Sequence, residues 1–517
     1  MRDSDEITEQ IVDTALRLHT GLGPGWLLCV VAVFTFLANA VAEDPAADLS
    51  ASPGLRVEQP TDSRVLPILT VERSDAGKAY LAWGGKPLLA YGPGDEMRLL
   101  SGGADVVRWA RWQSANGMNL VRGHPASVPI DAYGSPGLHP FNRKGDKWNV
   151  DDWNGTYFDN MSDAIGILED HGIFLHLQLW QIVWFKEAPN RWAINYLNPA
   201  NNVNEWTRGY AQGRHYLTAP AGSPGHAHRK QWVRRILNAV KGHRNVWIDV
   251  INELGGVPGT DLDWAREVVS WIREWEKDND GRLLVGVDSE SVYHSGAFKP
   301  YKNDYDVIMF NELRNRTLAI KAIDAFEMPA VSVRSSDGTN QWRDYMFANA
   351  DQVGPSHQSR YRRLCYRSIF AGLQAIGAYW KPEVAQADYL DMRDWPASAR
   401  ALRAFWGRIG PHWPELAVDD TMVSGAVAPH AYGLKSDRLY CVYLECGSHT
   451  HDNAYPASTV RIKCPFELER LHAEVFNPRT GESTTTRTSR IGTALDVSLP
   501  AFTDDSVVLI WRERKAG

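Results

Sequence analysis

Cysteine is scarce in this chain of 517 residues, and the chain has no excess of basic charge. Five cysteines are too few for a disulfide-dense scaffold, and the sequence does not reveal the pairing of Cys365, Cys441, Cys446 and Cys464. Lys and Arg number 55 against 62 Asp and Glu, and the resulting net charge of −7 argues against nucleic acid as the main partner. Hydrophobic residues at 44% and charged residues at 23% exclude a disordered, collagen-like or coiled-coil chain.

Motifs for metal and phosphate sites are weak or missing. No His-Glu-x-x-His motif occurs, and His124 and His176 belong to different predicted strands, which disfavours a metal-dependent hydrolase. Gly92-Pro93-Gly94 is a poor phosphate-binding turn, because proline has no amide N–H to donate. We therefore expect no metal and no cofactor.

The apolar run at residues 26–42 is short for a membrane span and is typical of a secretory signal ending in Ala40-Val41-Ala42. Its flank is unusual, because acidic residues outnumber basic ones in residues 1–25. We expect residues 1–25 to be an extraneous extension and residues 26–42 a signal peptide, so that the cleaved protein is secreted or periplasmic without stable membrane insertion. An uncleaved signal anchor is the alternative.

Residues 80–412 alternate short apolar runs with amphipathic helical segments, after a linker and lead-in strands at 43–79. Strand–helix alternation at this spacing predicts parallel βαβ units, and eight units in one stretch predict an α/β fold of the (β/α)8 TIM-barrel type. An open doubly wound sheet is the alternative. The eight runs are Pro87–Tyr91, Leu120–Arg122, Ile173–Trp180, Val246–Ile251, Leu283–Val287, Val307–Phe310, Ala330–Val333 and Ile376–Trp380.

Residues 413–517 contain short strand-like runs without helices, which predicts a small all-β sandwich. The sandwich either binds glycan or braces the barrel, and the sequence shows no exposed aromatic row to favour binding. The predicted strands are 439–444, 459–462, 473–476 and 507–511, with a turn at 477–481.

Tryptophan is abundant, with 21 residues, and its flat ring both fills cores and stacks on sugar rings. We expect Trp232, Trp264 and Trp271 in the core, because they lie on predicted helices. The insert at 181–226 is also rich in aromatic residues, and we expect it to shape the cleft.

Polar residues close each apolar run, and in a TIM barrel the active site lies at those strand ends. The fourth run leads into Asn252-Glu253. A carboxylic acid at the mouth of a half-buried strand has a raised pKa, because desolvation disfavours its charged form, and it can donate a proton near neutral pH. Other candidates at strand ends are Arg122, His124, His176, Trp180, Asn311, Glu312 and Trp380.

The stretch NVWIDVINE, at 245–253, resembles the fourth-strand motif of retaining glycoside hydrolases of clan A, which includes the family 5 cellulases. The resemblance extends over roughly residues 80–512 and includes a trailing sandwich. It implies that Glu253 is the general acid/base, that Arg122, His176 and Asn252 orient the sugar, and that Trp380 is the platform beneath it. We add His124, Trp180 and Asn311 as substrate-binding candidates.

The seventh run departs from that family. Retaining hydrolysis needs a second carboxylate about 5–5.5 Å from the first, and the family has a Glu at the end of the seventh strand. Here that position falls on Ser335 or Ser336. We prefer Asp337 as the nucleophile over Glu312; an inverting reaction through water and a more distant carboxylate is also open.

The sequence therefore predicts a secreted, cellulase-like glycosidase that cleaves O-glycosidic bonds of a polysaccharide or oligosaccharide. We expect a monomer with a carbohydrate substrate and with no nucleic-acid partner. The alternative is a catalytically impaired barrel that binds glycan without cleaving it.

Overall fold

The computed structural model describes residues 68–93, 97–102, 105–125, 138–185, 189–279, 281–313, 315–335, 355–378, 394–425, 428–446, 453–464, 466 and 471–512. These residues belong to one compact unit, Pro60–Gly517. The predicted extension at 1–25, the predicted signal at 26–42, Asp337 and Trp380 lie outside the described residues.

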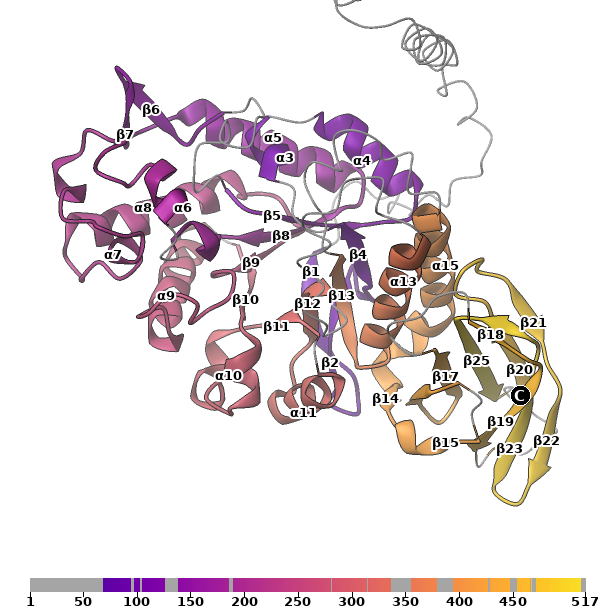
Figure 1. The fold of residues 1–517 in the computed structure, drawn as a ribbon. Helices are drawn as coiled ribbons and strands as arrows, with labels where there is room; N and C mark the ends of the chain where they lie inside the picture. The colour runs from indigo at the N-terminus through magenta and orange to yellow at the C-terminus, as the bar shows by residue number, and fades with distance from the viewer. Residues whose placement is uncertain are drawn as a thin grey trace, which may run out of the picture. The chain divides into compact units, whose positions relative to one another are not determined.

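Eight parallel strands form one sheet, in the order β4-β13-β12-β11-β10-β9-β8-β5 (Figure 1). Each of the eight predicted apolar runs overlaps one of these strands, and the predicted (β/α)8 TIM barrel is confirmed. The first run is displaced, because Lys86–Pro87 pairs separately as β3. The strands are β4 (Ala90–Pro93), β5 (Leu120–Gly123), β8 (Phe174–Gln178), β9 (Val246–Asp249), β10 (Leu284–Asp288), β11 (Val307–Glu312), β12 (Ala330–Ser335) and β13 (Leu373–Ala378).

The barrel closes between β4 and β5 through the residue that precedes β5. Asn119 donates its backbone N–H to Tyr91 O at 2.8 Å, and its side-chain Oδ1 accepts the Tyr91 N–H at 2.9 Å. The two strands approach so closely that a Cβ on Gly92 would lie 1.9 Å from Leu120 O. Glycine is therefore required at this position by space alone.

The N-terminal half of the barrel interior is apolar. A small antiparallel sheet of β1 (Leu69–Arg73), β2 (Ala79–Trp83) and β3 contributes Leu69 and Leu81 to the same cluster. Gln374 of β13 binds this sheet, donating to Leu81 O at 2.9 Å and accepting the Leu81 N–H at 2.8 Å. The inward side chains of the barrel strands in this cluster are Ala90, Leu120, Phe174, Trp247, Leu284, Val307, Met309, Val331 and Ala375.

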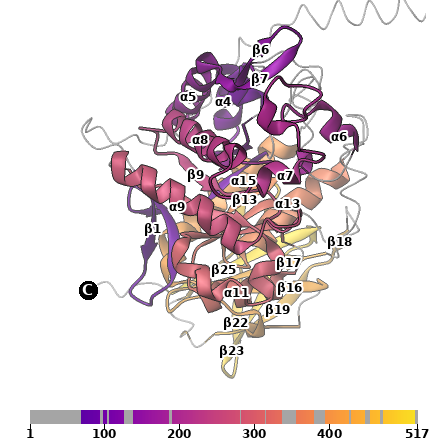
Figure 2. The ribbon, with the colours of Figure 1, turned by 90° about the vertical axis from the view of Figure 1, so that its left-hand side faces the viewer.

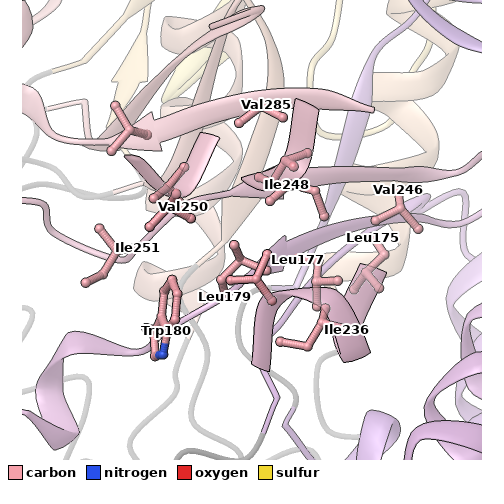
Figure 3. Packing of buried hydrophobic residues seen from close by; sticks show 14 of the residues in the cluster. Leu175, Leu177, Leu179, Trp180, Ile236, Val246, Ile248, Val250, Ile251 and Val285 are labelled. Atoms are coloured by element: carbon pink, nitrogen blue, oxygen red, sulfur yellow. The ribbon is translucent and has the colours of Figure 1, made fainter. Parts of the chain in front are cut away.

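Helices cover the outside of the barrel, as the two views show (Figures 1 and 2). Outward side chains of β8 and β9, such as Leu175 and Ile248, share one apolar cluster with Ile236 of α8 (Figure 3). One apolar face of each of α5, α8 and α9 is buried, and the buried residues of α8 and α9 include the predicted core residues Trp232, Trp264 and Trp271. The helices are α3 (Met97–Ser101), α4 (Val106–Ala115), α5 (Gly155–Asp170), α8 (Pro224–Ala239), α9 (Leu262–Asn279), α10 (Glu290–His294), α11 (Arg316–Phe326), α13 (Pro355–Ile369) and α15 (Asp394–Ile409). In the described ranges no helix is both long and apolar enough to cross a membrane.

The C-terminal region forms a six-stranded sheet, β14-β16-β17-β25-β20-β21, and a four-stranded sheet, β15-β19-β23-β22, which share an apolar core. The four predicted strands correspond to β17, β19, β20 and β25. The strands are β14 (Ala417–Val418), β15 (Val423–Ser424), β16 (His430–Lys435), β17 (Leu439–Glu445), β18 (Ala454–Tyr455), β19 (Ser458–Lys463), β20 (Leu471–Phe476), β21 (Ser483–Thr485), β22 (Thr488–Ile491), β23 (Ala494–Leu499), β24 (Phe502–Thr503) and β25 (Asp505–Arg512).

Helices α13 and α15 join the barrel to the six-stranded sheet (Figure 1). Phe405 of α15 and Tyr443 of β17 belong to one apolar cluster with Tyr91 of the barrel. Arg362 of α13 pairs with the buried Asp505 at 2.7 Å, and the Tyr443 hydroxyl donates to the same carboxylate at 3.1 Å. A shared core and a buried ion pair of this kind support the bracing interpretation of the sandwich.

We predict that Gly92→Ala destabilises the fold by about 3 kcal/mol or more, because the new methyl group forces β4 and β5 apart. Urea unfolding followed by circular dichroism measures the decrease in the free energy of unfolding. Gly407→Ala is the matched control: a Cβ added to this exposed glycine of α15 would meet nothing within 4 Å, and alanine there should stabilise the helix by up to about 1 kcal/mol. Equal stability of Gly92→Ala and the native protein would contradict the proposed closure.

Candidate active site

The polar interior of the barrel begins where the apolar cluster ends. Side chains alternate along a strand, so the positions two residues beyond Leu120, Phe174 and Trp247 also face inward. Arg122 and His176 are register partners on β5 and β8. The buried polar residues at or just after the ends of β5, β8, β9 and β10 form a layer here called the polar layer, and each is at most 2% exposed. They are Arg122, His124, His176, Gln178, Asp249 and Asp288.

Asp249 lies at the centre of this polar layer. Its Oδ2 accepts a hydrogen bond from Gln178 Nε2 at 2.7 Å and contacts His176 Nε2 at 3.2 Å. Its Oδ1 accepts the backbone N–H groups of Ile251 at 3.3 Å and Asp288 at 3.1 Å. A fully buried carboxylate needs such partners, since burying an unpaired charge costs far more than one hydrogen bond returns.

Asn252 and Glu253 form the turn that follows β9 at the C-terminal end of the barrel. Asn252 is 1% exposed, donates its N–H to Trp180 O at 3.1 Å, and lies with its Oδ1 3.5 Å from Gln178 Nε2. Glu253, the next residue, is half-buried. The position predicted from NVWIDVINE is therefore at the mouth of the fourth barrel strand.

The backbone of Glu253 is left-handed, with φ of 55°. For a residue other than glycine this conformation costs about 1–3 kcal/mol and persists only where the surroundings hold it. Glu327 has φ of 54° as well, but it ends helix α11, where a left-handed residue is ordinary. The strain at Glu253 therefore coincides with the predicted general acid/base.

Trp180, predicted as a substrate-binding residue, is buried in the apolar cluster of this structure. The predicted run continues to Trp180, but β8 ends at Gln178 and the chain turns there. The Trp180 side chain is 1% exposed and lies edge-on to Trp264, with ring centroids 5.5 Å apart. Figure 3 shows it among Leu179, Val250 and Ile251 in the apolar cluster.

The remaining predicted residues divide into two groups. Arg122, His124, His176 and Asn252 lie in or beside the buried polar layer. Asn311 and Glu312 are the last residues of β11, where Glu312 is the register partner of Arg334, and their side chains lie outside the described part of the chain.

Asp249 and Asp288 were missed as site residues. Both are single acidic residues at the ends of otherwise apolar strands, VWID and LVGVD. Since Asp is almost never fully buried without a partner, an Asp at an inward position of a barrel strand is a signal that the sequence already contained.

Two loops at the C-terminal end of the barrel pack against each other through aromatic side chains. The hairpin β6 (Phe141–Lys144) and β7 (Lys147–Trp153) follows the second barrel strand, and residues 181–217 follow the third. His228 joins them: its Nε2 lies 2.9 Å from Val150 O, and its Nδ1 lies 3.0 Å from the Tyr216 hydroxyl. The insert contains η4 (Ile182–Trp184), α6 (Pro189–Ile194), η5 (Glu205–Thr207) and α7 (Arg214–Leu217).

The aromatic side chains of this insert mainly pack against the hairpin and one another. Trp206 donates its indole N–H to Asp151 at 3.1 Å and lies edge-on to Tyr210. Tyr196 lies edge-on to Trp148 of the hairpin, with ring centroids 5.1 Å apart. Among the described residues, no group of three His, Cys, Asp or Glu side chains gathers as a metal site.

The fold is similar to solved structures of glycoside hydrolases. A family 5 glycoside hydrolase from Bacteroides vulgatus ATCC 8482 is 13% identical, with a TM-score of 0.54 over 86% of this chain and 96% of its own. Another structure, described as a glycoside hydrolase, is 12% identical, with a TM-score of 0.54 over 86% of this chain and 97% of its own. No protein-family model matches the sequence, and no curated protein matches it. The similarity shows a shared fold.

We predict that the stability of the protein falls below pH 6.5 in part through His228. Burial lowers the pKa of His228 from 6.5 to about 4, so the folded state keeps the imidazole neutral while the unfolded chain takes up a proton. This contribution is constant above pH 6.5 and is lost as the pH falls from 6.5 to 4, by about 3 kcal/mol in total.

Denaturant unfolding of the native protein and of His228→Gln, from pH 7.5 to 4, measures this effect. Gln keeps an N–H for Val150 O but does not titrate, so the stability gap between the two proteins should narrow as the pH falls. His472→Gln, at an exposed position on β20, is the control, and its gap should stay nearly constant. A constant gap for His228→Gln would contradict the prediction.

Proposed function

We propose that the protein is a secreted glycoside hydrolase that cleaves O-glycosidic bonds of a polysaccharide or oligosaccharide with two carboxylates. The observation that carries the proposal is the place of Asn252-Glu253 directly after the fourth strand of an eight-stranded parallel barrel. The architecture shared with glycoside hydrolases supports it.

Glu253 is the proton donor and base in this proposal. The residue is half-buried and follows β9 at the mouth of the barrel, where the sequence predicts a carboxyl that can donate a proton. The acid protonates the leaving oxygen, and the carboxylate then activates water. Asn252, His176 and Arg122 line the layer beneath it and supply hydrogen-bond donors for the sugar hydroxyls near the reacting carbon.

The second carboxylate comes from the rim next to the seventh strand. β12 ends at Ser335, and a serine hydroxyl cannot form the usual glycosyl ester. Asp337, two residues further along the chain, is the preferred nucleophile, and Glu312 at the end of the neighbouring β11 is the alternative. A separation of about 5–5.5 Å between the carboxyls gives retention, whereas about 6.5–9.5 Å gives inversion.

The proposal includes export. Residues 26–42 supply the apolar run and the small-x-small ending of a secretory signal. A polysaccharide too large to enter a cell is a substrate that an exported enzyme reaches.

We predict that Glu253→Gln lowers turnover at least about 100-fold, because the amide cannot donate and recover a proton. The native protein and the variant are assayed on β-glucan, mannan and aryl glycosides, and glycan binding is measured in parallel. Glu274→Gln is the matched control, since Glu274 lies on α9 in ion pairs with Lys230 and Arg234, and it should retain full activity. Glycan binding without turnover by the native protein would instead support the impaired, glycan-binding barrel.

We predict that Asp337→Asn abolishes turnover and that Glu312→Gln lowers it much less. Proton NMR of the first product anomer identifies the stereochemistry, and retention is expected if Asp337 forms the glycosyl ester. Inversion, or full activity of Asp337→Asn with loss in Glu312→Gln, would assign the second role away from Asp337.

A further inference from the structure

The left-handed turn at Glu253 is held by the end of the neighbouring strand. The Glu253 N–H donates to Asp288 Oδ2 at 3.3 Å, and the Leu254 N–H donates to Asp288 O at 2.8 Å. Ser289 Oγ donates in return to Leu254 O at 3.4 Å. Residues 288 and 289 therefore contact the turn through a side-chain carboxylate, a backbone carbonyl and a hydroxyl.

Asp288 is itself fixed from below. Its side chain is fully buried, and its backbone N–H donates to Asp249 Oδ1 at 3.1 Å. Asp249 in turn binds Gln178 and His176 of β8 through its other oxygen. Two buried carboxylates thus connect three adjacent barrel strands to the backbone of one half-exposed glutamate.

We propose that Asp288 is a positioning residue that directs the carboxyl of Glu253 towards the glycosidic oxygen. The inference rests on the proposed function, because it assigns Asp288 a role in proton donation by Glu253. Asp288 is buried and contacts the backbone of the turn, so it acts through Glu253 and does not contact the sugar.

A positioning role predicts a specific kinetic signature. A dinitrophenolate leaves a glycoside without protonation, whereas a phenolate leaves slowly unless an acid protonates it. A variant that misplaces Glu253 therefore loses activity on phenyl glycosides far more than on dinitrophenyl glycosides of the same sugar. A variant that is only less stable loses both equally, since the ratio of the two kcat/KM values does not depend on the folded fraction.

The test variant is Asp288→Asn, which retains the size and one acceptor oxygen but removes the charge and one acceptor. We expect kcat/KM for phenyl glycosides to fall at least about 30-fold and for dinitrophenyl glycosides less than about 3-fold, within the range of general-acid catalysis. Asp306→Asn is the matched control, because Asp306 Oδ2 also accepts a backbone N–H, from Val285 at 2.9 Å, but precedes β11 at the opposite end of the barrel. The ratio of the two kcat/KM values for Asp306→Asn should equal that of the native protein.

An unchanged ratio in Asp288→Asn, with a catalytically active native protein, would overturn the inference and leave the proposed function intact. Absence of turnover by the native protein on both classes of glycoside would overturn the proposed function and the inference with it. If Asp288→Asn does not fold, Asp288→Glu retains the charge but displaces the carboxylate by one methylene. The same change in ratio is expected from it, and a native ratio would overturn the inference.

Discussion

The burial of the Asp249 carboxylate is the constraint on which the C-terminal half of the barrel interior depends. A carboxylate in a protein interior is tolerated only when its lone pairs are occupied, and Asp249 meets this requirement with groups from the third, fourth and fifth strands. Each donor must lie in one place for the charge to stay buried. The turn that carries Glu253 is bonded to this polar layer through Asp288.

The two ends of the barrel serve different purposes. At the N-terminal end, Leu81 enters the apolar interior and Gln374 ties the lead-in sheet to β13, so that end is closed by packing. On another side of the barrel, α13 and the six-stranded sheet share a core that includes the buried pair of Arg362 and Asp505. Packing away from the polar layer therefore contributes to stability at both places. The strained backbone of Glu253 and the buried polar residues lie instead at the C-terminal strand ends and in the loops after them.

Much of this fold could be predicted from the sequence, because a barrel strand buried on both faces reads as a short apolar run and a helix closed by glycine reads as a periodic one. Gly172 and Gly242, which follow α5 and α8 closely in the sequence, have positive φ. The predicted run that reaches Trp180 extends beyond the observed strand, which ends at Gln178, because periodicity does not locate the end of a strand to within two residues. Asp249 was overlooked because its neighbours in the chain are apolar, and its partners come from other strands.

The conformation of Glu253 could not be predicted for a related reason. Neither Asn252 nor Leu254 requires a left-handed residue between them, and the hydrogen bonds that hold it come from Asp288 and Ser289, distant in the sequence. The same reasoning applies to the second carboxylate of the proposed mechanism. One hydrogen bond that holds the backbone of Glu253, the proposed acid/base, comes from Asp288 at the end of the fifth strand. The proposed proton donor and the preferred nucleophile therefore belong to different parts of the barrel rim: the backbone of Glu253 is bonded to the end of the fifth strand, and Asp337 follows the seventh strand in the sequence.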